Sequence, residues 1–417
     1  MFENMKKTKY LIIGAGISGL AFASKKSGED YIILEKENEP GGYCRTVKRN
    51  GFVWDYAGHF FHFRTRQLQE EFYELLHNES AVFQTKQTAI KYKDDYVDYP
   101  FQFNIHQLPK EEFIECLVDL FTKDTDKMDT FKEMLYAKFG GGISEKFLIP
   151  YNQKLYACDL NKLDRDAMGR FFPMADPVQI VQSFKKEQLS SYNDSFYYSA
   201  DGAFAFVDAF LKRIDASKIQ YNAEIEKIDT ETKIAYVNGE EISYEYLIST
   251  IAFPDLLQIS NTPHADVFSA NQVLVFNIGF DGPSNDEKSH WIYYPEDKYC
   301  FYRVGYYNNI LRRQPMSLYV EIGYKQDAEI DVQTAYEQTL IDLKKAGIVD
   351  EQKPVDYCYM IMNPAYVHIS RESQMEKERI MKEYASKGIH CVGRYGSWTY
   401  CSIEDCILEA YELCNNI

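Results

Sequence analysis

Three glycines near the start of the chain constrain its fold more than any other feature. A short apolar run at 10–13 leads directly into Gly14-x-Gly16-x-x-Gly19, and an apolar segment of helical length follows. In a strand–loop–helix unit of this kind, the first glycine makes the tight turn and the second lets the backbone approach a pyrophosphate. The third lets the helix pack close to the strand, and the helix N-terminus offers free N–H groups to the phosphates. The pattern predicts a Rossmann-type α/β domain that binds a dinucleotide.

A second apolar run and an acidic residue complete this pattern. Residues 31–34 are typical of the next parallel strand, and Glu35 follows 21 positions after Gly14. A carboxylate at this place accepts hydrogen bonds from the adenosine ribose. The lysines at 6–9 and the small residues at 21–24 also imitate a secretory signal. The three glycines have the spacing typical of a dinucleotide-binding loop, and Glu35 follows them, so the sequence favours nucleotide binding over secretion.

The sequence after Glu35 indicates which dinucleotide is bound. Gly41-Gly42 provides a second close backbone approach, Arg45 follows as a phosphate partner, and Gly58-His59 comes after an aromatic run. This arrangement resembles the flavin-dependent branch that includes amine oxidases, protoporphyrinogen oxidases and UDP-galactopyranose mutases. The resemblance implies FAD as the cofactor, because nicotinamide enzymes usually lack the second glycine pair.

The overall composition argues against several kinds of partner. Acidic residues outnumber basic ones by 63 to 46, for a net charge of −17, so we expect neither nucleic acid nor an anionic lipid surface to bind. No run of 18 apolar residues is present, and we expect no transmembrane segment. Nine cysteines without a CxxC pair favour free thiols in a reducing cytoplasm. His59-x-x-His62 lacks a further ligand beside it, so we expect no metal site.

The string from Tyr99 to Gln102 is the first sign of a substrate. Tyr-Pro-Phe-Gln is followed by Asn104 and by a Leu-Pro-Lys-Glu-Glu helix start at 108–112. It closely resembles UDP-galactopyranose mutases of the fungal and protozoal type, and this resemblance implies that Tyr99, Phe101 and Gln102 hold a uracil ring. The residues by themselves leave open a proline-fixed turn with a buried phenylalanine before an ordinary helix.

Two segments further along continue the same resemblance. Residues 150–154, Pro-Tyr-Asn-Gln-Lys, match the mutase string Pro-Tyr-Asn-x-Lys-x-Trp. Asn152 is then expected to face uracil, and Tyr156 stands where the family has tryptophan. Arg170 falls one position early against the family's phosphate-binding arginine. Core packing at helical spacing is the alternative for Tyr156.

The mutase resemblance also implies the diphosphate contacts. Arg303, in Phe-Tyr-Arg-Val, matches the principal diphosphate arginine of the family, and a planar guanidinium can grip a diphosphate with two hydrogen bonds. Tyr366 and Tyr400 lie 34 positions apart, the spacing of the family's two diphosphate-binding tyrosines. Plain sheet packing of the many tyrosines, and a surface salt bridge at Arg303, are the alternatives.

The last motif resembles the closing flavin-contact turn of the superfamily. Gly393-Arg394-x-Gly-x-Trp-x-Tyr has the form found in fungal-type mutases, and a helix N-terminus is expected to point at the flavin ring there. The amide-bearing residues that the family carries after this point are replaced by Glu404 and Asp405. Acids beside an anionic substrate are unexpected.

These features together predict the architecture. We expect an α/β protein with a GxGxxG Rossmann-type FAD-binding domain, an interleaved helical insert and an antiparallel substrate-binding sheet of about six strands. The expected boundaries are 1–90, 195–262 and 380–417 for the discontinuous FAD-binding domain, 91–194 for the insert, and 263–379 for the substrate sheet and its helix.

The leading hypothesis for function is flavin-dependent isomerisation of a nucleotide-diphosphate sugar. The resemblance implies interconversion of UDP-galactopyranose and UDP-galactofuranose through N5 of the reduced flavin, in the synthesis of cell-surface polysaccharide precursors. The partners would be a UDP-galactose-like substrate and NAD(P)H or another reductant in the cytoplasm, and the oligomeric state stays open. The alternatives are an FAD-dependent oxidoreductase of the amine oxidase or protoporphyrinogen oxidase type, and a flavin-bound protein without turnover.

The expected site residues fall into three groups. The catalytic group is His59, Arg170 and Arg303. The cofactor-binding group is Gly14, Gly16, Gly19, Glu35, Gly41, Gly42, Arg45, Gly58, Gly393, Arg394 and Asp405. The substrate-binding group is Tyr99, Phe101, Gln102, Asn152, Tyr156, Arg303, Tyr366 and Tyr400.

Overall fold

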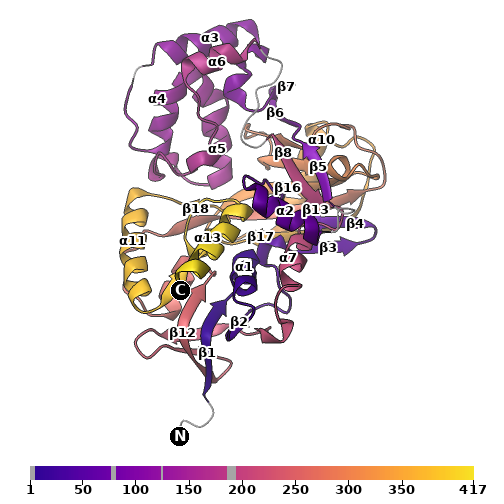
Figure 1. Cartoon of the computed structure of the whole chain (residues 1–417). Coiled ribbons are helices and arrows are strands. Elements are labelled where there is room, and N and C mark those ends of the chain that lie inside the picture. Colours follow the sequence, from indigo (N-terminus) through magenta and orange to yellow (C-terminus); the bar gives the residue numbers. More distant parts are fainter. Residues whose placement is uncertain (1–4, 77–80, 124, 186–193) are drawn as a thin grey trace.

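The chain forms two large sheets and a separate group of helices (Figure 1). The computed structural model describes residues 5–76, 81–123, 125–185 and 194–417. No helix in these ranges is both long and apolar enough to cross a membrane. All nine cysteines lie within them and are free thiols.

The first sheet is built around β1 (Lys6–Ile13), the strand that leads into the glycine loop. It pairs in parallel with β2 (Tyr31–Leu34) on one side and with β12 (Glu240–Ser249) on the other. The other strands are β9 (Ile219–Gln220), β10 (Ile225–Asp229), β11 (Ile234–Val237) and β19 (Ile389–Cys391), in the order β10-β11-β12-β1-β2-β9 with β19 beside β12. Three distant segments of the chain therefore build one sheet, and the predicted Rossmann-type α/β class is confirmed.

Helices surround this sheet because its central strands are apolar on both faces. α1 (Ile17–Lys25) packs against α13 (Ile403–Asn416) and α7 (Phe204–Leu211), so the two ends of the chain meet at one core. The other helices of this part are α2 (Arg66–Leu75), α8 (Phe253–Ile259), α11 (Arg371–Ser386) and the short α12 (Gly393–Gly396). Two small strand pairs complete it: β3 (Thr46–Arg49) with β4 (Phe52–Asp55), and β5 (Ala81–Thr85) with β8 (Ser195–Ser199).

The second sheet has eight strands, where the sequence predicts about six. Its core is antiparallel: β13 (Ser269–Phe280) pairs with β16 (Ser317–Lys325) and β17 (Pro354–Met362), and β15 (Arg303–Tyr306) joins β16 to β14 (Trp291–Tyr293). β18 (Val367–His368) pairs with one end of β13. The additional strands β6 (Thr88–Tyr92) and β7 (Asp95–Asp98) attach through β14. The predicted domain boundaries stay a prediction.

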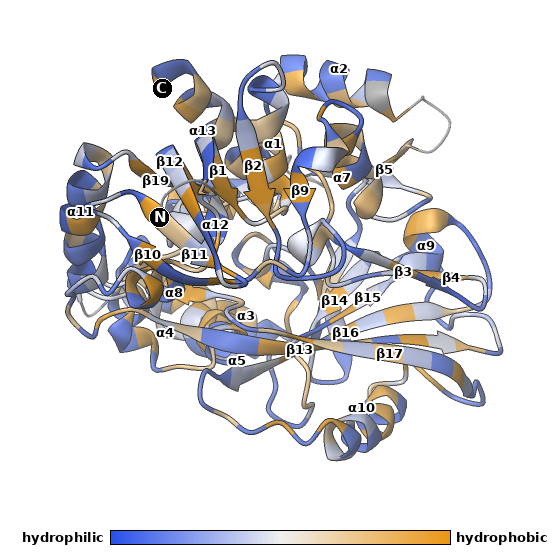
Figure 2. Ribbon diagram, turned by 90° about the horizontal axis from the view of Figure 1, so that it is seen from below, coloured by the Kyte–Doolittle hydropathy of each residue, from blue (hydrophilic) through white to orange (hydrophobic). Residues whose placement is uncertain are grey.

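Strand alternation divides this sheet into two different faces. One face carries aliphatic and aromatic side chains that pack against α10 (Val332–Lys345), which lies beneath the sheet in Figure 2. The other face turns toward the first domain and carries Trp291, Tyr293, Arg303, Tyr319 and Glu321. The polar and aromatic residues of the second sheet are thereby collected on the side of the glycine loop.

The helical insert contains α3 (Lys110–Phe121), α4 (Phe131–Ile143), α5 (Ile149–Tyr156) and α6 (Pro177–Ser183), and forms the upper part of Figure 1. A glycine run interrupts α4: Gly140 has φ +72°, and a Cβ there would lie 2.5 Å from the carbonyl oxygen of Asp119. Lys154 anchors the insert to the second sheet. Its ammonium donates to the carbonyl oxygens of Tyr294, Glu296, Tyr299 and Phe301 at 2.6–3.0 Å, just before Arg303 in the chain.

Candidate functional site

The glycine loop leaves open space at the N-terminus of α1. Gly14 has φ +98°, and a Cβ on Gly19 would lie 2.1 Å from the carbonyl oxygen of Gly14, because the helix packs directly against the end of β1. A Cβ on Gly16 would meet nothing within 4 Å. A phosphate group beside Gly16 can therefore reach the free N–H groups of the helix without steric hindrance.

Glu35 holds this loop in place from the end of β2. Its buried carboxylate accepts hydrogen bonds from the backbone N–H groups of Ala15 at 2.8 Å and Glu37 at 3.0 Å. The acid is thus built into the loop structure as well as lying at the predicted ribose position.

The second glycine pair lies beside the first loop. Gly41 donates its N–H to the carbonyl oxygen of Ala15 at 2.8 Å, and a Cβ on Gly42 would lie 3.5 Å from the Cα of Gly16. Arg45 folds back over the pair, and its Nε donates to the carbonyl oxygen of Gly42 at 2.9 Å. Two stretches of backbone approach each other with no side chain between them, which fits a pyrophosphate.

The C-terminal turn closes onto the same loop. β19 ends at Cys391, and Gly393 follows two residues later with φ +83°; a Cβ there would lie 2.2 Å from the Oγ of Ser18 in α1. The N–H of Gly393 donates to the Glu409 carboxylate of α13 at 2.7 Å. This close contact places Arg394, the next residue, at the junction of the first domain and the second sheet.

Arg394 lies against two stacked tyrosines. The ring centroids of Tyr366 and Tyr400 are 5.9 Å apart with an interplanar angle of 19°, and the guanidinium carbon is 5.1 and 4.6 Å from them. Tyr156 packs edge-on to Tyr366 at 5.8 Å. The Nε of Arg394 and the hydroxyl of Tyr156 are buried and have no hydrogen-bond partner among the described residues. Four predicted residues from three separate segments, Tyr156, Tyr366, Arg394 and Tyr400, thus form one cluster with cationic and hydroxyl groups.

Arg303 faces this cluster from the second sheet. Its Nε and Nη2 donate to the two carboxylate oxygens of Glu321 at 2.8 and 2.7 Å, across neighbouring strands. Burial raises the pKa of Tyr366, and the nearby charge of Arg303 opposes that increase. Glu321 takes one edge of the planar guanidinium, so the other edge is the one that can bind an anion.

The predicted base contacts are buried in the insert. Phe101 is fully buried and stacks on Phe147, with 5.3 Å between ring centroids. The amide nitrogen of Gln102 donates to the carbonyl oxygen of Pro173 at 2.5 Å, and that of Asn152 donates to Leu148 at 2.6 Å. The side-chain oxygens of both amides are buried without a partner among the described residues.

Tyr99 links these base contacts to the second sheet. Its ring lies 4.8 Å from that of Tyr293, centroid to centroid. Tyr293 shares its sheet face with Arg303 and pairs with it across β14 and β15. The expected base and diphosphate contacts are therefore connected through packed aromatic rings.

His59 is a neutral side chain between two cations. Burial, followed by the positive charges of Arg394 and Arg303, lowers the pKa of His59 to about 4. Its Nδ1 is buried and has no partner among the described residues, whereas the Nδ1 of His62 lies 2.8 Å from the carbonyl oxygen of Ser195. No group of three metal-ligating side chains occurs in the described ranges.

Buried histidines make the stability of this fold sensitive to acid. Burial lowers the pKa values of His59, His62 and His290 to about 4, well below the usual 6.5. As the pH falls from 6.5 toward 4, these histidines therefore become protonated in the unfolded chain but stay neutral in the native state. Asp55 acts in the opposite direction, because burial raises its pKa to about 6 and protonation in that range favours the fold. Three groups outweigh one, and we expect stability to fall with acidification.

The expected loss is roughly 2–4 kcal/mol between pH 7 and pH 5, since each unit of pKa shift corresponds to about 1.4 kcal/mol. Urea unfolding at several pH values measures it. His290→Gln removes one of the three groups and should make the dependence shallower. A free energy of unfolding that is equal or higher at pH 5 would contradict this account.

The two unexpected acids near the C-terminus bind groups of the protein itself. Glu404 is buried and accepts hydrogen bonds from the backbone N–H groups of Arg64 and Thr65 at 2.9 Å each. Asp405 forms a capping box with Ser402 at the start of α13 and pairs with the guanidinium groups of Arg64 and Arg170. Arg170 thus lies at the site with a carboxylate already beside it.

Two site residues were missed by the sequence reasoning. Neither Glu321 nor Tyr319 is among the residues that the sequence predicts for the site. The signal was available in strand alternation, because residues 317, 319 and 321 share a face with Arg303. Tyr319 is fully buried, and a Cβ on Gly58 would lie 2.8 Å from its hydroxyl. Gly58 is thereby needed where the loop before His59 approaches the second sheet.

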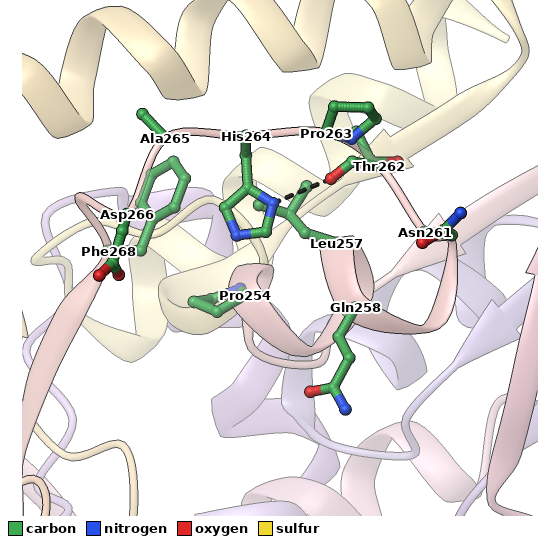
Figure 3. A pocket seen from close by; sticks show the side chains of 10 residues that line it. All are labelled: Pro254, Leu257, Gln258, Asn261, Thr262, Pro263, His264, Ala265, Asp266 and Phe268. Carbon is green, nitrogen blue, oxygen red and sulfur yellow. Dashed lines mark hydrogen bonds between the residues drawn. The ribbon is translucent and has the colours of Figure 1, made fainter.

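A surface pocket beside α8 is separate from this site. Figure 3 shows that it is formed by α8 and the following loop, and its lining residues are Pro254, Leu257, Gln258, Asn261, Thr262, Pro263, His264, Ala265, Asp266 and Phe268. The Nδ1 of His264 lies 2.9 Å from the carbonyl oxygen of Thr262. None of the predicted site residues lines this pocket, so the clustered glycines, arginines and tyrosines remain the candidate site.

Known proteins resemble this chain along nearly its whole length. The family model for flavin containing amine oxidoreductases matches residues 17–417. UDP-galactopyranose mutase of Mycoplasma pneumoniae is 23% identical over 188 residues, which cover 40% of this chain and 45% of the mutase. The zeta-carotene-forming phytoene desaturase of Myxococcus xanthus is 35% identical over 57 residues, 13% of this chain and 11% of the desaturase. The matched segments span less than half of either curated relative.

Solved structures share the fold. A reduced UDP-galactopyranose mutase superposes with a TM-score of 0.90 at 24% identity, covering 98% of this chain and 93% of that one. A proposed protoporphyrinogen oxidase from Exiguobacterium sp. superposes with a TM-score of 0.79 at 16% identity and covers 99% of both chains. At these identities the likeness establishes the fold, which serves both kinds of enzyme.

Proposed function

Because the chain belongs to the flavin containing amine oxidoreductase family and uses FAD as its cofactor, we propose that it isomerises a nucleotide-diphosphate sugar in the manner of a UDP-galactopyranose mutase. The fold alone does not choose between a mutase and an oxidase. The proposal therefore depends on the charged and hydrogen-bonding side chains of the site, and on the kind of substrate that they can bind.

The first domain fits the cofactor. The open space at Gly16, the bare backbone at Gly41-Gly42 and the N-terminus of α1 together suit a pyrophosphate. When bound, reduced FAD supplies the nucleophilic N5 that such an isomerisation requires. The task of the protein residues is to bind the nucleotide, orient the sugar and balance the charge of the diphosphate.

The cluster of Arg394 with Tyr156, Tyr366 and Tyr400 is the observation that supports a diphosphate substrate most strongly. Arg394 has a buried Nε without a partner among the described residues and lies against the stacked rings of Tyr366 and Tyr400. Arg303 adds a second guanidinium from the opposite sheet. Two buried cations and three tyrosine hydroxyls suit two phosphates, whereas an amine substrate would be repelled by them.

Gln102 and Asn152 support a nucleotide rather than a simple phosphate ester. Each has a buried amide oxygen without a partner among the described residues, and such an oxygen accepts a hydrogen bond from a ring N–H. Uracil carries one N–H group between two carbonyl oxygens. We therefore propose uracil as the base and UDP-galactose as the first substrate to test; the natural reductant, NAD(P)H or another, and the cytoplasmic location stay predictions.

An oxidoreductase of the amine oxidase or protoporphyrinogen oxidase type is the second candidate. The family model and the neighbour with a TM-score of 0.79 favour it. The aromatic face around Trp291, Tyr293 and Tyr319 could pack against an apolar substrate. The two candidates differ in their use of electrons, and NMR detection of a ring-size change in UDP-galactose, supplied to the reduced protein, separates them.

The charge of Arg303 should be required for nucleotide binding. Arg303→Ala is expected to weaken UDP binding by about 2–5 kcal/mol, the scale of a buried charge contact. Tyr366→Phe and Tyr400→Phe should each cost about 0.5–1.5 kcal/mol. Isothermal titration of the FAD-bound protein with UDP measures these losses.

The control for Arg303 must remove its partner as well, because Arg303→Ala leaves the Glu321 carboxylate buried and unpaired. The pair Arg303→Met with Glu321→Gln deletes both charges. It should retain FAD and stability and still lose UDP affinity. If this double variant binds UDP as tightly as the original protein, the diphosphate lies elsewhere.

A further inference from the structure

Asp405 joins two arginines from different parts of the chain. It lies in the first turn of α13, and its Oδ1 accepts a hydrogen bond from the Nη2 of Arg64 at 2.5 Å. Its Oδ2 accepts from the Nη2 of Arg170, and also from the backbone N–H of Ser402 at 2.8 Å. Arg170 belongs to the helical insert, so this carboxylate bridges the insert and the first domain.

The Arg170–Asp405 ion pair lies beside the cluster of Tyr156, Tyr366, Arg394 and Tyr400. Phe171, the neighbour of Arg170, packs edge-on to Tyr400 with 5.2 Å between ring centroids. Tyr400 in turn stacks on Tyr366 and contacts Arg394. The side chains of Arg170 and Asp405 are 33% and 22% exposed, so a ligand arriving from solvent can reach them.

The carboxylate changes the balance of charge at the site. In the described chain, Arg64 pairs with both Glu404 and Asp405, Arg170 pairs with Asp405, and Arg303 pairs with Glu321. The Arg394 guanidinium donates to two uncharged groups, the carbonyl oxygens of Cys401 at 3.3 Å and Ala365 at 3.4 Å. Burial would raise the pKa of Asp405, but hydrogen bonds from Ser402 and Arg170 outweigh burial and hold that pKa below its usual value. Asp405 is therefore an anion at neutral pH.

We propose that Asp405 weakens diphosphate binding by competing with the substrate diphosphate for the Arg170 guanidinium. The inference depends on the proposed nucleotide-sugar function. A phosphate oxygen that binds the Nη2 of Arg170 must displace the carboxylate oxygen from it, and a phosphate at another N–H of the same guanidinium would be repelled by the negative charge of Asp405. Asp405 thereby lowers affinity for diphosphates, and Arg394 and Arg303 provide the remaining positive charge.

The test is Asp405→Asn in the FAD-bound protein. Asparagine is isosteric, and its amide oxygen can still accept from the Ser402 N–H, so the start of α13 is kept. With the competing charge gone, the Kd for UDP and for inorganic pyrophosphate should each fall about tenfold, the scale of one charge-assisted hydrogen bond. Calorimetric titration at constant ionic strength measures both.

Asp356→Asn is the matched control. Asp356 also bridges two side chains, those of Arg49 and Asn50, and neither of them is a predicted site residue. This variant removes the same unit of negative charge from the chain and should leave both Kd values unchanged. A gain in this control would mean that net charge, and not the Arg170 contact, controls affinity, and the inference would be wrong.

A double-mutant cycle locates the effect. In the Arg170→Gln background, Asp405→Asn should give no gain, because the contested guanidinium is absent. A gain that persists there, or an Asp405→Asn protein that binds UDP no better than the original, overturns the inference. If the original protein binds and isomerises UDP-galactose in either case, the proposed function stands; if no variant binds UDP or pyrophosphate, both proposals are wrong.

Discussion

Protein reduced with dithionite and kept free of oxygen is expected to interconvert the pyranose and furanose forms of UDP-galactose over many turnovers. The oxidised protein should not interconvert the two forms. The substrate and the product of this isomerisation are isomers, so no electrons leave the enzyme and the flavin ends each turnover as it began. The change from inactive to active on reduction is therefore the largest effect that we predict.

The measurement combines NMR of the sugar with the visible absorption of the flavin. The ring forms should approach equilibrium while the reduced protein stays colourless. An oxidase behaves differently, because it must pass electrons to oxygen on every turnover. Hydrogen peroxide produced in proportion to the loss of an amine, with no sugar isomer formed, would select the oxidoreductase in place of the mutase.

The Gly16→Val protein is expected to fold but to purify almost without FAD. A Cβ on Gly16 meets no protein atom within 4 Å, so the substitution should leave the free energy of unfolding of the FAD-free chain nearly unchanged. The branched side chain fills the space that a pyrophosphate needs at the N-terminus of α1. The Kd for FAD should rise by more than about tenfold, because a clash of only about 1.4 kcal/mol has that consequence, and most of the flavin should be lost during purification.

Gly28→Val is the matched control for this prediction. A Cβ on Gly28 also meets nothing within 4 Å, its φ imposes no left-handed conformation, and the residue is exposed after α1. Valine at this position should therefore retain full FAD content. Gly16→Val protein that still binds one FAD per chain would show that the pyrophosphate does not lie at this loop.

Motifs that are contiguous in the chain were predictable because short-range covalent geometry limits what they can form. Gly14, Gly16 and Gly19 need only a strand, a tight turn and a helix, and these arise from residues within ten positions of one another. The apolar strand before Gly14 is of the same kind. The sequence by itself therefore determined the α/β class and, by resemblance, FAD; both are confirmed.

Contacts between distant segments were decided only by the tertiary structure. Glu321 reaches Arg303 through the register of two strands, and Asp405 reaches Arg170 because α13 and the insert pack at the same edge. Sequence showed an unexpected acid at 405, but not the arginines beside it. Spacing along a chain defines local turns, whereas the partner of a charged side chain depends on which elements pack together. That packing is set by the burial of apolar faces throughout the protein.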